Sequence, residues 1–230
     1  MDWYPICFME IIMTRLTLLV VSLALVAPFL PSNQAFAGEE RVSGSAVIRE
    51  MNLARQNPAL YASYIEELRS HFDGRFLVLP GHTRLGTKEG VGALDDAIRF
   101  LHSSRPLLAL TLSPGMCRGA ADHCADQMNG AMGHDGSDRS NPGARMSRYG
   151  VWSSSWGENI SYGKTTARDI VIALIVDDGL PARKHRQNIF NPNFNYAGAA
   201  YGAHARYRSV CSIDFAGGYT ERGQTVAQNF

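Results

Sequence analysis

The fold is decided by three short stretches: Gly133-His134, Gly157-Glu158-Asn159-Ile160 and Lys184-His185-Arg186-Gln187-Asn188-Ile189. Each contains a histidine or a carboxylate in a Gly- or Asn-containing context rather than in the apolar repeat of a helix. Residues in such contexts lie in loops or at the ends of elements, where binding and catalytic side chains gather. One such histidine alone is more often a structural hydrogen-bond donor. Together, His134, Glu158 and His185 indicate one shared site.

Residues 1–37 are predicted to be a secretory signal. Leu16–Leu30 is an apolar run that follows Arg15 and precedes the small-residue segment Ala35-Phe36-Ala37, which is the pattern of a signal with its cleavage site. The alternative is a membrane anchor, but the run is shorter than the roughly 20 residues that span a bilayer. The mature chain is therefore expected to begin at Gly38.

The true start of translation is expected to be Met13. Residues 1–12 contain two acidic residues and no basic one, whereas a signal begins with a positively charged region. Starting at Met13 leaves Arg15 in that region.

Residues 38–230 are expected to form a single domain. The chain of 230 residues has 45% apolar and 19% charged residues, an ordinary globular composition that supports one core. Its formal net charge of +1 gives no support for a nucleic-acid-binding protein.

Apolar spacing, caps and breakers predict a series of helices. A first helix within residues 42–68 should break near Asn57-Pro58. The others are expected at 59–69, 94–101, 114–129, 145–149 and 167–176. The helix at 114–129 has Ser113 as its N-cap and should bury Cys117, Ala121, Cys124 and Met128 in one stripe.

Strands are expected mainly in the C-terminal part. Alternation predicts strands at 159–162 and 208–215, and a Gly/Ala-rich, closely packed strand at 196–201, with the last two forming an antiparallel hairpin. Residues 70–92 should be a long loop or short hairpin and residues 151–156 a Ser/Trp-rich loop. The tail after Gly217-Gly218 should fray.

The mature chain contains three cysteines, Cys117, Cys124 and Cys211. Within one helix, seven residues separate the first two by roughly 10 Å along the axis, too far for a disulfide, which needs less than about 7 Å between Cα atoms. Any bridge should therefore join Cys211 to one of the other two. The alternative is three buried free thiols.

Two adjacent aspartates, Asp177 and Asp178, follow the helix expected at 167–176. Negative charge at a helix C-terminus is unfavourable by about 0.3 to 1 kcal/mol for each group. Their presence needs a reason other than helix stability, and a bound cation is one candidate.

The motifs around His134, Glu158 and His185 resemble those of the bacterial branch of the CAP family, which joins cysteine-rich secretory proteins, antigen 5 and pathogenesis-related proteins. The resemblance runs from about Arg41 to about Tyr219. It implies a secreted α+β protein, folded as a three-layer α-β-α sandwich of the CAP/SCP type. It also implies a surface cleft lined by two histidines and two acidic residues that can bind zinc.

The resemblance assigns the metal site to His134, His185, Glu158 and Asp177. In many relatives the second acidic residue is a glutamate about 20 residues beyond the Gly-Glu-Asn motif, and Asp177 lies 19 residues after Glu158; Asp178 is the alternative. Imidazole nitrogens suit zinc, and carboxylates can ligate it or orient its ligands. His134 and His185 are the expected direct ligands.

Two functions fit this site. One is a secreted binding module, extracellular or periplasmic and without a membrane span after signal cleavage, whose cleft takes a lipid, peptide or glycan. The other is a zinc-dependent hydrolase with Glu158 as general base. The binding module is favoured because the sequence contains no nucleophile-elbow serine, no His-Glu-x-x-His pair and no cysteine with an activating partner.

Overall fold

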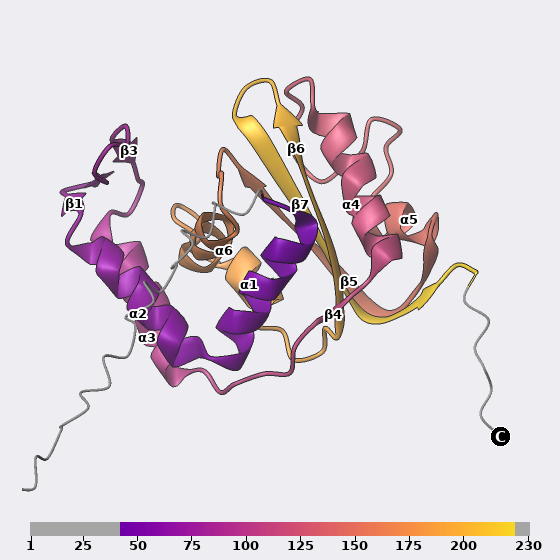
Figure 1. Cartoon of the computed structure of the whole chain (residues 1–230), viewed down its shortest axis with the longest axis horizontal. Helices are drawn as coiled ribbons and strands as arrows, with labels where there is room; N and C mark the ends of the chain where they lie inside the picture. The colour runs from indigo at the N-terminus through magenta and orange to yellow at the C-terminus, as the bar shows by residue number, and fades with distance from the viewer. Residues whose placement is uncertain (1–41, 224–230) are drawn as a thin grey trace, which may run out of the picture. The chain divides into compact units, whose positions relative to one another are not determined.

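The computed structural model describes residues 42–223 (Figure 1), so the predicted signal and the proposed start at Met13 lie outside the described residues. The described residues belong to one compact unit. Within them, no helix is long and apolar enough to cross a bilayer.

A four-stranded sheet in the order β4-β6-β7-β5 forms the centre of this unit. The strands are β4 (Thr111–Leu112), β5 (Gly150–Tyr162), β6 (Tyr196–His204) and β7 (Arg208–Glu221). The last two form the expected antiparallel hairpin. Strand β5 pairs antiparallel with the other side of β7, and β4 pairs parallel with β6.

Helices cover both faces of the sheet (Figure 1). One face carries α4 (Pro114–Gln127) and α5 (Pro142–Ser147). Over the other lie α1 (Gly44–Gln56) and α6 (Ala167–Val176), with α2 (Pro58–Arg69), α3 (Val91–Ser103) and α7 (Lys184–Ile189) packed around them. This is the α+β, three-layer sandwich that the family resemblance implies.

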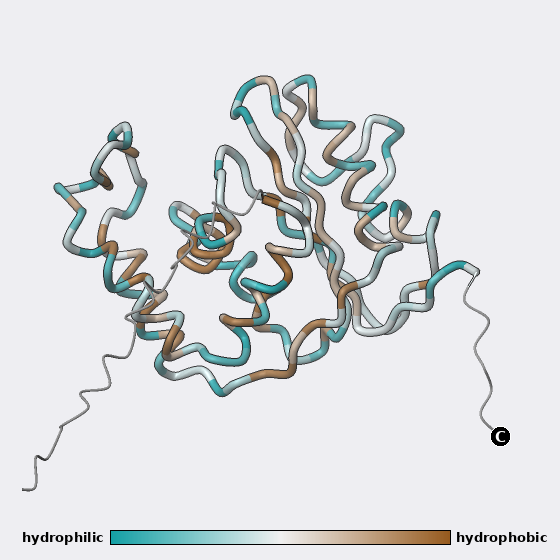
Figure 2. Tube along the Cα trace, viewed as in Figure 1, coloured by the Kyte–Doolittle hydropathy of each residue, from teal (hydrophilic) through white to brown (hydrophobic). Residues whose placement is uncertain are grey.

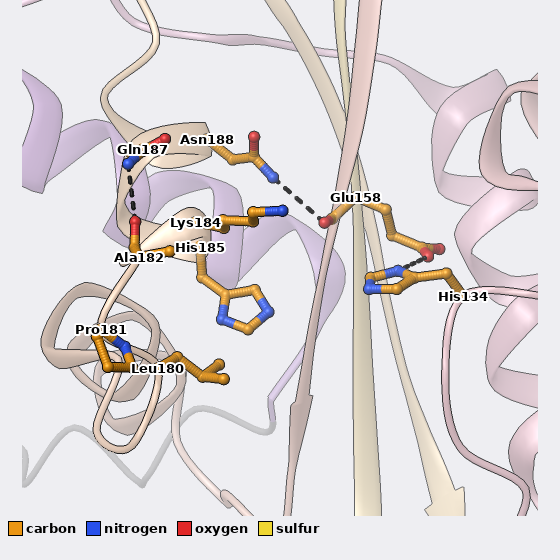
Figure 3. Close-up of a pocket in the computed structure, with 9 residues that line it drawn as sticks. All are labelled: His134, Glu158, Leu180, Pro181, Ala182, Lys184, His185, Gln187 and Asn188. Carbon is orange, nitrogen blue, oxygen red and sulfur yellow. Dashed lines mark hydrogen bonds and ion pairs between the residues drawn. The ribbon is translucent and has the colours of Figure 1, made fainter.

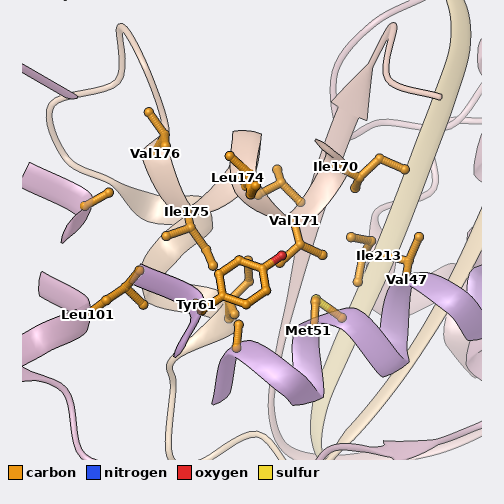
Figure 4. Packing of buried hydrophobic residues seen from close by; sticks show 14 of the residues in the cluster. Val47, Met51, Tyr61, Leu101, Ile170, Val171, Leu174, Ile175, Val176 and Ile213 are labelled. Atoms are coloured by element: carbon orange, nitrogen blue, oxygen red, sulfur yellow. The ribbon is translucent and has the colours of Figure 1, made fainter. Parts of the chain in front are cut away.

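The larger hydrophobic core lies between the sheet and the α1/α6 layer, and part of it is shown in Figure 4. Helix α6 contributes most of its length because it is apolar nearly all round, as its brown colour in Figure 2 shows. Alternation along β7 points Cys211, Ile213 and Phe215 into this core. Ser212 and Asp214 therefore face α4 on the opposite side.

Two predictions for the region around β5 were wrong. Residues 151–156 are not a loop but the first half of β5, and the tail after Gly217-Gly218 does not fray before Glu221, because the two segments pair with each other from Gly150↔Glu221 onward. The register shifts between Ser153 and Trp156, and Ser154 there has a φ of 70°. This β-bulge, together with adjacent glycines, removes the alternation that would reveal a strand.

Several helix predictions need smaller corrections. The break between α1 and α2 at Asn57-Pro58 and the Ser113 cap of α4 are confirmed. Helix α3 is longer than predicted, and α5 begins three residues earlier. Residues 70–92 hold a small sheet of three two-residue strands, β1 (Phe72–Asp73), β2 (Phe76–Leu77) and β3 (Leu85–Gly86).

The buried face of α4 matches the predicted stripe only in part: Cys124 is buried and Cys117 is half-buried. Met128 is 52% exposed and Ala121 is exposed too, whereas the polar side chains of His123 and Gln127 are buried. Hydrogen bonds with each other and with the Gly133 carbonyl compensate in part for burying these two polar residues, although Nδ1 of His123 has no partner within residues 42–223. Apolar spacing therefore identifies only part of the buried face.

The structure also corrects the disulfide prediction. All three cysteines of the described residues are free. Cys117 and Cys124 belong to α4, whereas Cys211 is buried in the core on the other face of the sheet. The backbone of β7 therefore separates Cys211 from both, and a bridge to either would require rearrangement of the sheet. Burial raises the pKa of the Cys124 thiol to about 11, which keeps it protonated and unreactive.

Candidate functional site

A surface cavity of about 590 Å³ lies where α7 and the α6–α7 connection face β5 (Figure 3). Three of the four predicted site residues line it: His134, Glu158 and His185. The rest of the wall consists of Leu180, Pro181, Ala182, Lys184, Gln187 and Asn188. In Figure 3 the two imidazole rings approach the same space from opposite walls. The structure thus brings together residues separated by up to 51 positions in sequence.

His134 is held by Glu158. The Nδ1 atom of His134 lies 2.7 Å from Oε1 of Glu158. The other oxygen, Oε2, accepts hydrogen bonds from Nη2 of Arg145 at 2.7 Å and from the Ser212 hydroxyl at 3.0 Å. The carboxylate side chain is only 1% exposed, whereas the imidazole side chain is 56% exposed. Glu158 therefore lies behind the ring, and Nε2 of His134 remains available to the cleft.

The chain turns into His134 through Gly133, just beyond α4. Gly133 has a φ of 105°, a conformation that a side chain would strain. Its carbonyl accepts hydrogen bonds from Gln127 Nε2 at 2.6 Å and is 2.9 Å from His123 Nε2. The carbonyl of His134 accepts one from Nη1 of Arg145 at 3.1 Å. His123 thus helps to position the residue before His134.

His185 is held by Asp177 in the same manner. Its Nδ1 lies 2.7 Å from Oδ1 of Asp177, and its backbone N–H donates to Oδ2 at 3.1 Å. Asp177 occupies the left-handed region as the C-cap of α6, with a φ of 55°. Asp178 instead accepts from the backbone N–H groups of Lys88 and Glu89 at 2.7 and 2.8 Å. Asp177 is therefore the aspartate at the site, and both aspartates have partners that offset their position at the helix end.

The Gly-Glu-Asn motif on β5 and the His-Arg-Gln-Asn motif on α7 bond directly to each other. Asn159 donates from Nδ2 to the His185 carbonyl at 3.0 Å. Asn188 donates from Nδ2 to Oδ1 of Asn159 at 2.8 Å and to the Glu158 carbonyl at 3.3 Å. Arg186, buried at 4% exposure, donates to the Ile175 carbonyl at the end of α6 and so fixes α7 against it. These bonds explain why the Gly-Glu-Asn and His-Arg-Gln-Asn motifs occur together.

Sequence reasoning missed the buried polar groups behind the cleft. Arg145 and Asp214 are both fully buried, and neither Asp214 oxygen has a hydrogen-bond partner within residues 42–223. Burial, reinforced by the nearby charge of Glu158, raises the pKa of Asp214 well above its usual range. Burial thus favours the protonated form of Asp214, and the carboxylate that Arg145 bonds is that of Glu158. No local pattern reveals these residues because each sits in an ordinary helix or strand context.

The site has limited capacity for a metal ion. Among residues 42–223, no group of three or more His, Cys, Asp and Glu side chains is arranged to hold one. The carboxylates of Glu158 and Asp177 each form a hydrogen bond with the Nδ1 atom of one histidine. The Nε2 atoms of His134 and His185 have no hydrogen-bond partner in the described part of the chain. A carboxylate bound to one imidazole nitrogen fixes the tautomer and orients the other nitrogen toward a metal. The donor set therefore fits zinc through two histidines, fewer protein ligands than the three of a catalytic zinc site.

The His134–Glu158 contact predicts a pH-dependent contribution to stability. The hydrogen bond with Glu158 raises the pKa of His134. Its stabilising effect is then fully present below the unfolded pKa of about 6.5 and is lost as the pH rises through the folded pKa. We expect His134→Gln to lower the free energy of unfolding more at about pH 5 than at about pH 8, as measured by urea denaturation. An equal loss at both pH values would contradict this assignment.

Comparisons with known proteins agree with this architecture. The model of the cysteine-rich secretory protein family, CAP, matches residues 50–215. The uncharacterized protein YkwD of Bacillus subtilis is 34% identical over 68 residues, which cover 30% of this chain and 24% of that relative's length. The chain thus spans well under two thirds of the curated relative that it matches.

Two solved structures are also similar. An outer surface protein of Borrelia burgdorferi aligns with a TM-score of 0.41 and 14% identity, over 71% of this chain and 93% of that one. An extracellular protein containing an SCP domain from Bacillus anthracis aligns with a TM-score of 0.38 and 24% identity, over 54% of this chain and 40% of that one. With the family model matching most of its residues, the chain belongs to the cysteine-rich secretory protein (CAP) family.

Proposed function

We propose that this chain is a secreted CAP-family binding module whose cleft takes an extracellular ligand, a lipid, peptide or glycan, beside two histidines that can hold zinc. The apolar run at residues 16–30 and the small-residue segment after it support secretion. The cavity of about 590 Å³ has the size of a small-molecule site.

One observation supports the zinc proposal above all others. His134 and His185 line the same cavity, and each has its Nδ1 atom 2.7 Å from a buried carboxylate oxygen. This arrangement directs both Nε2 atoms to the cleft, where each could bind a metal ion. When bound there, zinc would supply a Lewis acid with positions open to solvent or to a ligand.

The geometry supports a binding module better than a hydrolase. A general base must reach the proton that it removes, within about 3 Å or through one water. Glu158 has a side chain that is only 1% exposed and bonds on both oxygens, to His134, Arg145 and Ser212. Its role is therefore to orient His134 rather than to activate a water. Among the described residues, no other acid lines the cavity.

Zinc binding to the mature protein tests this proposal. Isothermal titration at about pH 7.5 is expected to give one zinc ion for each chain, and affinity should fall as the pH drops toward about 5.5, because protons compete for the imidazole nitrogens. The double variant His134→Ala, His185→Ala is expected to lose binding. Its melting temperature should no longer rise with zinc, since a ligand stabilises only the state that it binds.

A matched control is His102→Ala. His102 is exposed and pairs with Glu66 at 3.0 Å, away from the cleft, so its loss should leave zinc affinity unchanged. Unchanged affinity in the double variant would remove zinc from the proposed function. Glu158→Gln should weaken binding less than either histidine replacement, because it alters the orientation of one ligand only.

A further inference from the structure

Lys184 is a cation in the cleft without a partner. It is exposed, and among the described residues its ammonium group has no hydrogen bond or ion pair. In Figure 3 its side chain extends from α7 toward β5, into the space beside His185. Lys184 is also the first residue of α7, where a positive charge opposes the helix dipole. Helix stability therefore does not explain this lysine.

The charge that the cleft presents to a ligand is positive. Lys184 and Glu158 are the only side chains of the described lining that are charged irrespective of histidine protonation. Glu158 is 1% exposed, and Arg145 neutralises it at 2.7 Å. Asp177, behind His185, is 3% exposed on its side chain. In the metal-free cleft, a bound molecule would meet one permanent positive charge, surrounded by imidazole and amide groups that can donate hydrogen bonds.

An apolar surface lies next to this charge. Leu180, Pro181 and Ala182 form the wall contributed by the α6–α7 connection, and Leu180 is 48% exposed. The connection is held firmly, because Arg183 donates to both oxygens of Glu89 at 2.7 Å and to the Asp177 carbonyl at 2.8 Å. The aliphatic wall is thus a preformed part of the cavity.

We propose that the cleft ligand is a monocarboxylate with an aliphatic group, whose carboxylate pairs with Lys184 and whose aliphatic part packs on Leu180 and Pro181. This inference rests on the proposed function as a ligand-binding cleft and names the ligand's chemistry. A single cation matches a single negative charge, whereas a phosphate dianion would leave charge uncompensated in a partly enclosed site. Both a fatty acid and the C-terminal residue of a peptide carry this chemistry.

The test is a titration of chelator-treated, ¹⁵N-labelled mature protein with hexanoate at about pH 7.5, followed by NMR. Hexanoate is expected to shift the backbone amides of residues 184–188, and the neutral isostere hexanamide should bind at least about tenfold more weakly, the effect of a charge-assisted contact. Lys184→Gln should weaken hexanoate binding by about the same factor. Lys164→Gln is the matched control, since Lys164 does not line the cavity.

Equal affinities for hexanoate and hexanamide, unchanged hexanoate binding in Lys184→Gln, or no shifts with hexanoate at tens of millimolar would each overturn the proposal. An unaltered amide spectrum of Lys184→Gln outside the cleft shows that the variant is folded. Octanoate and N-acetyl-leucine then distinguish a fatty acid from a peptide C-terminus as the ligand. Tighter binding of octanoate indicates a fatty acid, and tighter binding of N-acetyl-leucine indicates a peptide C-terminus. Because the titration contains no metal, its outcome is independent of whether zinc binds His134 and His185.

Discussion

Replacing Arg145 by Met is expected to lower the free energy of unfolding by about 3 to 5 kcal/mol, the usual cost of removing one partner of a buried ion pair. Arg145 is fully buried, and its Nη2 atom lies 2.7 Å from Glu158, which is then left as an uncompensated charge. The variant also loses the bonds to the carbonyls of His134 and Ser140. Thermal and urea unfolding should show a melting temperature lower by roughly 10 °C.

Arg148→Met provides the matched control. Arg148 forms ion pairs of 2.7 and 2.6 Å with Asp122 and Asp138, but its side chain is 36% exposed. Surface pairs contribute only about 0 to 1 kcal/mol, so this variant should remain close to the wild type. The double variant Arg145→Met, Glu158→Gln should be more stable than Arg145→Met alone, because no unpaired charge remains. Equal costs for Arg145→Met and Arg148→Met would show that the buried pair is not what stabilises this part of the fold.

The residues of the candidate site were easier to single out from the sequence than their surroundings, because they lie in locally distinctive contexts. Gly133, with a φ of 105°, marks a turn in the loop after α4, and Asp177 is the C-cap of α6. Glycine signals such turns without tertiary information. Asn159 and Asn188 belong to the same motifs. The local sequence around Arg145, Ser212 and Asp214 contains no such signal. These residues become part of the site only because α4, α5 and β7 are packed together, and a single sequence does not encode that packing in local spacing.

The wrong predictions for residues 151–156 and for the segment after Gly217-Gly218 also arise because tertiary contacts are not visible in local sequence. Residues 151–156 look like a loop because serines and tryptophans do not alternate there, yet β7 pairs with this segment on both sides of the bulge between Ser153 and Trp156. Strand formation depends on the partner as much as on the local sequence. The partner itself, residues 217–221, looks like a tail for the equivalent reason. Two segments that are individually weak strand formers thus stabilise each other.

The partly wrong prediction for the buried face of α4 shows how tertiary hydrogen bonds override hydrophobic spacing. His123 and Gln127 are buried because they hold the Gly133 carbonyl. Met128, which fits the apolar stripe, is exposed. The buried face of α4 thus combines apolar residues such as Met116 and Cys124 with two polar residues that hold the loop leading to His134. A polar pair at i and i+4 near the end of a helix that precedes a predicted site residue is a signal that can be sought in other sequences.

Helix α4 lies so close to β6 that glycine is required at the contact. A Cβ atom at Gly198 would be 2.3 Å from the Cys117 backbone nitrogen and 2.3 Å from the Met116 carbonyl carbon. Both are backbone atoms that cannot move without moving the helix. At Gly202, four residues further along the same face of β6, the nearest atom is Cβ of Cys124 at 3.3 Å. The Gly/Ala-rich composition predicted that this strand is closely packed. Of its two glycines, only Gly198 faces backbone atoms so near that a side chain would displace α4.

Gly198→Ala is expected to lower the free energy of unfolding by about 3 kcal/mol, the upper end for overpacking a core, because α4 must shift away from the sheet. Gly202→Ala should change it by less than about 1 kcal/mol, since a side-chain contact can relax and alanine reduces the entropy of the unfolded chain. Urea unfolding of the two variants measures both. Because α4 also sets the position of His123 and Gly133, Gly198→Ala should shift the NMR signals of His134, whereas Gly202→Ala should not. Similar stabilities of the two variants would mean that helix and strand tolerate separation, and that the close contact is not what fixes His134 at the cleft.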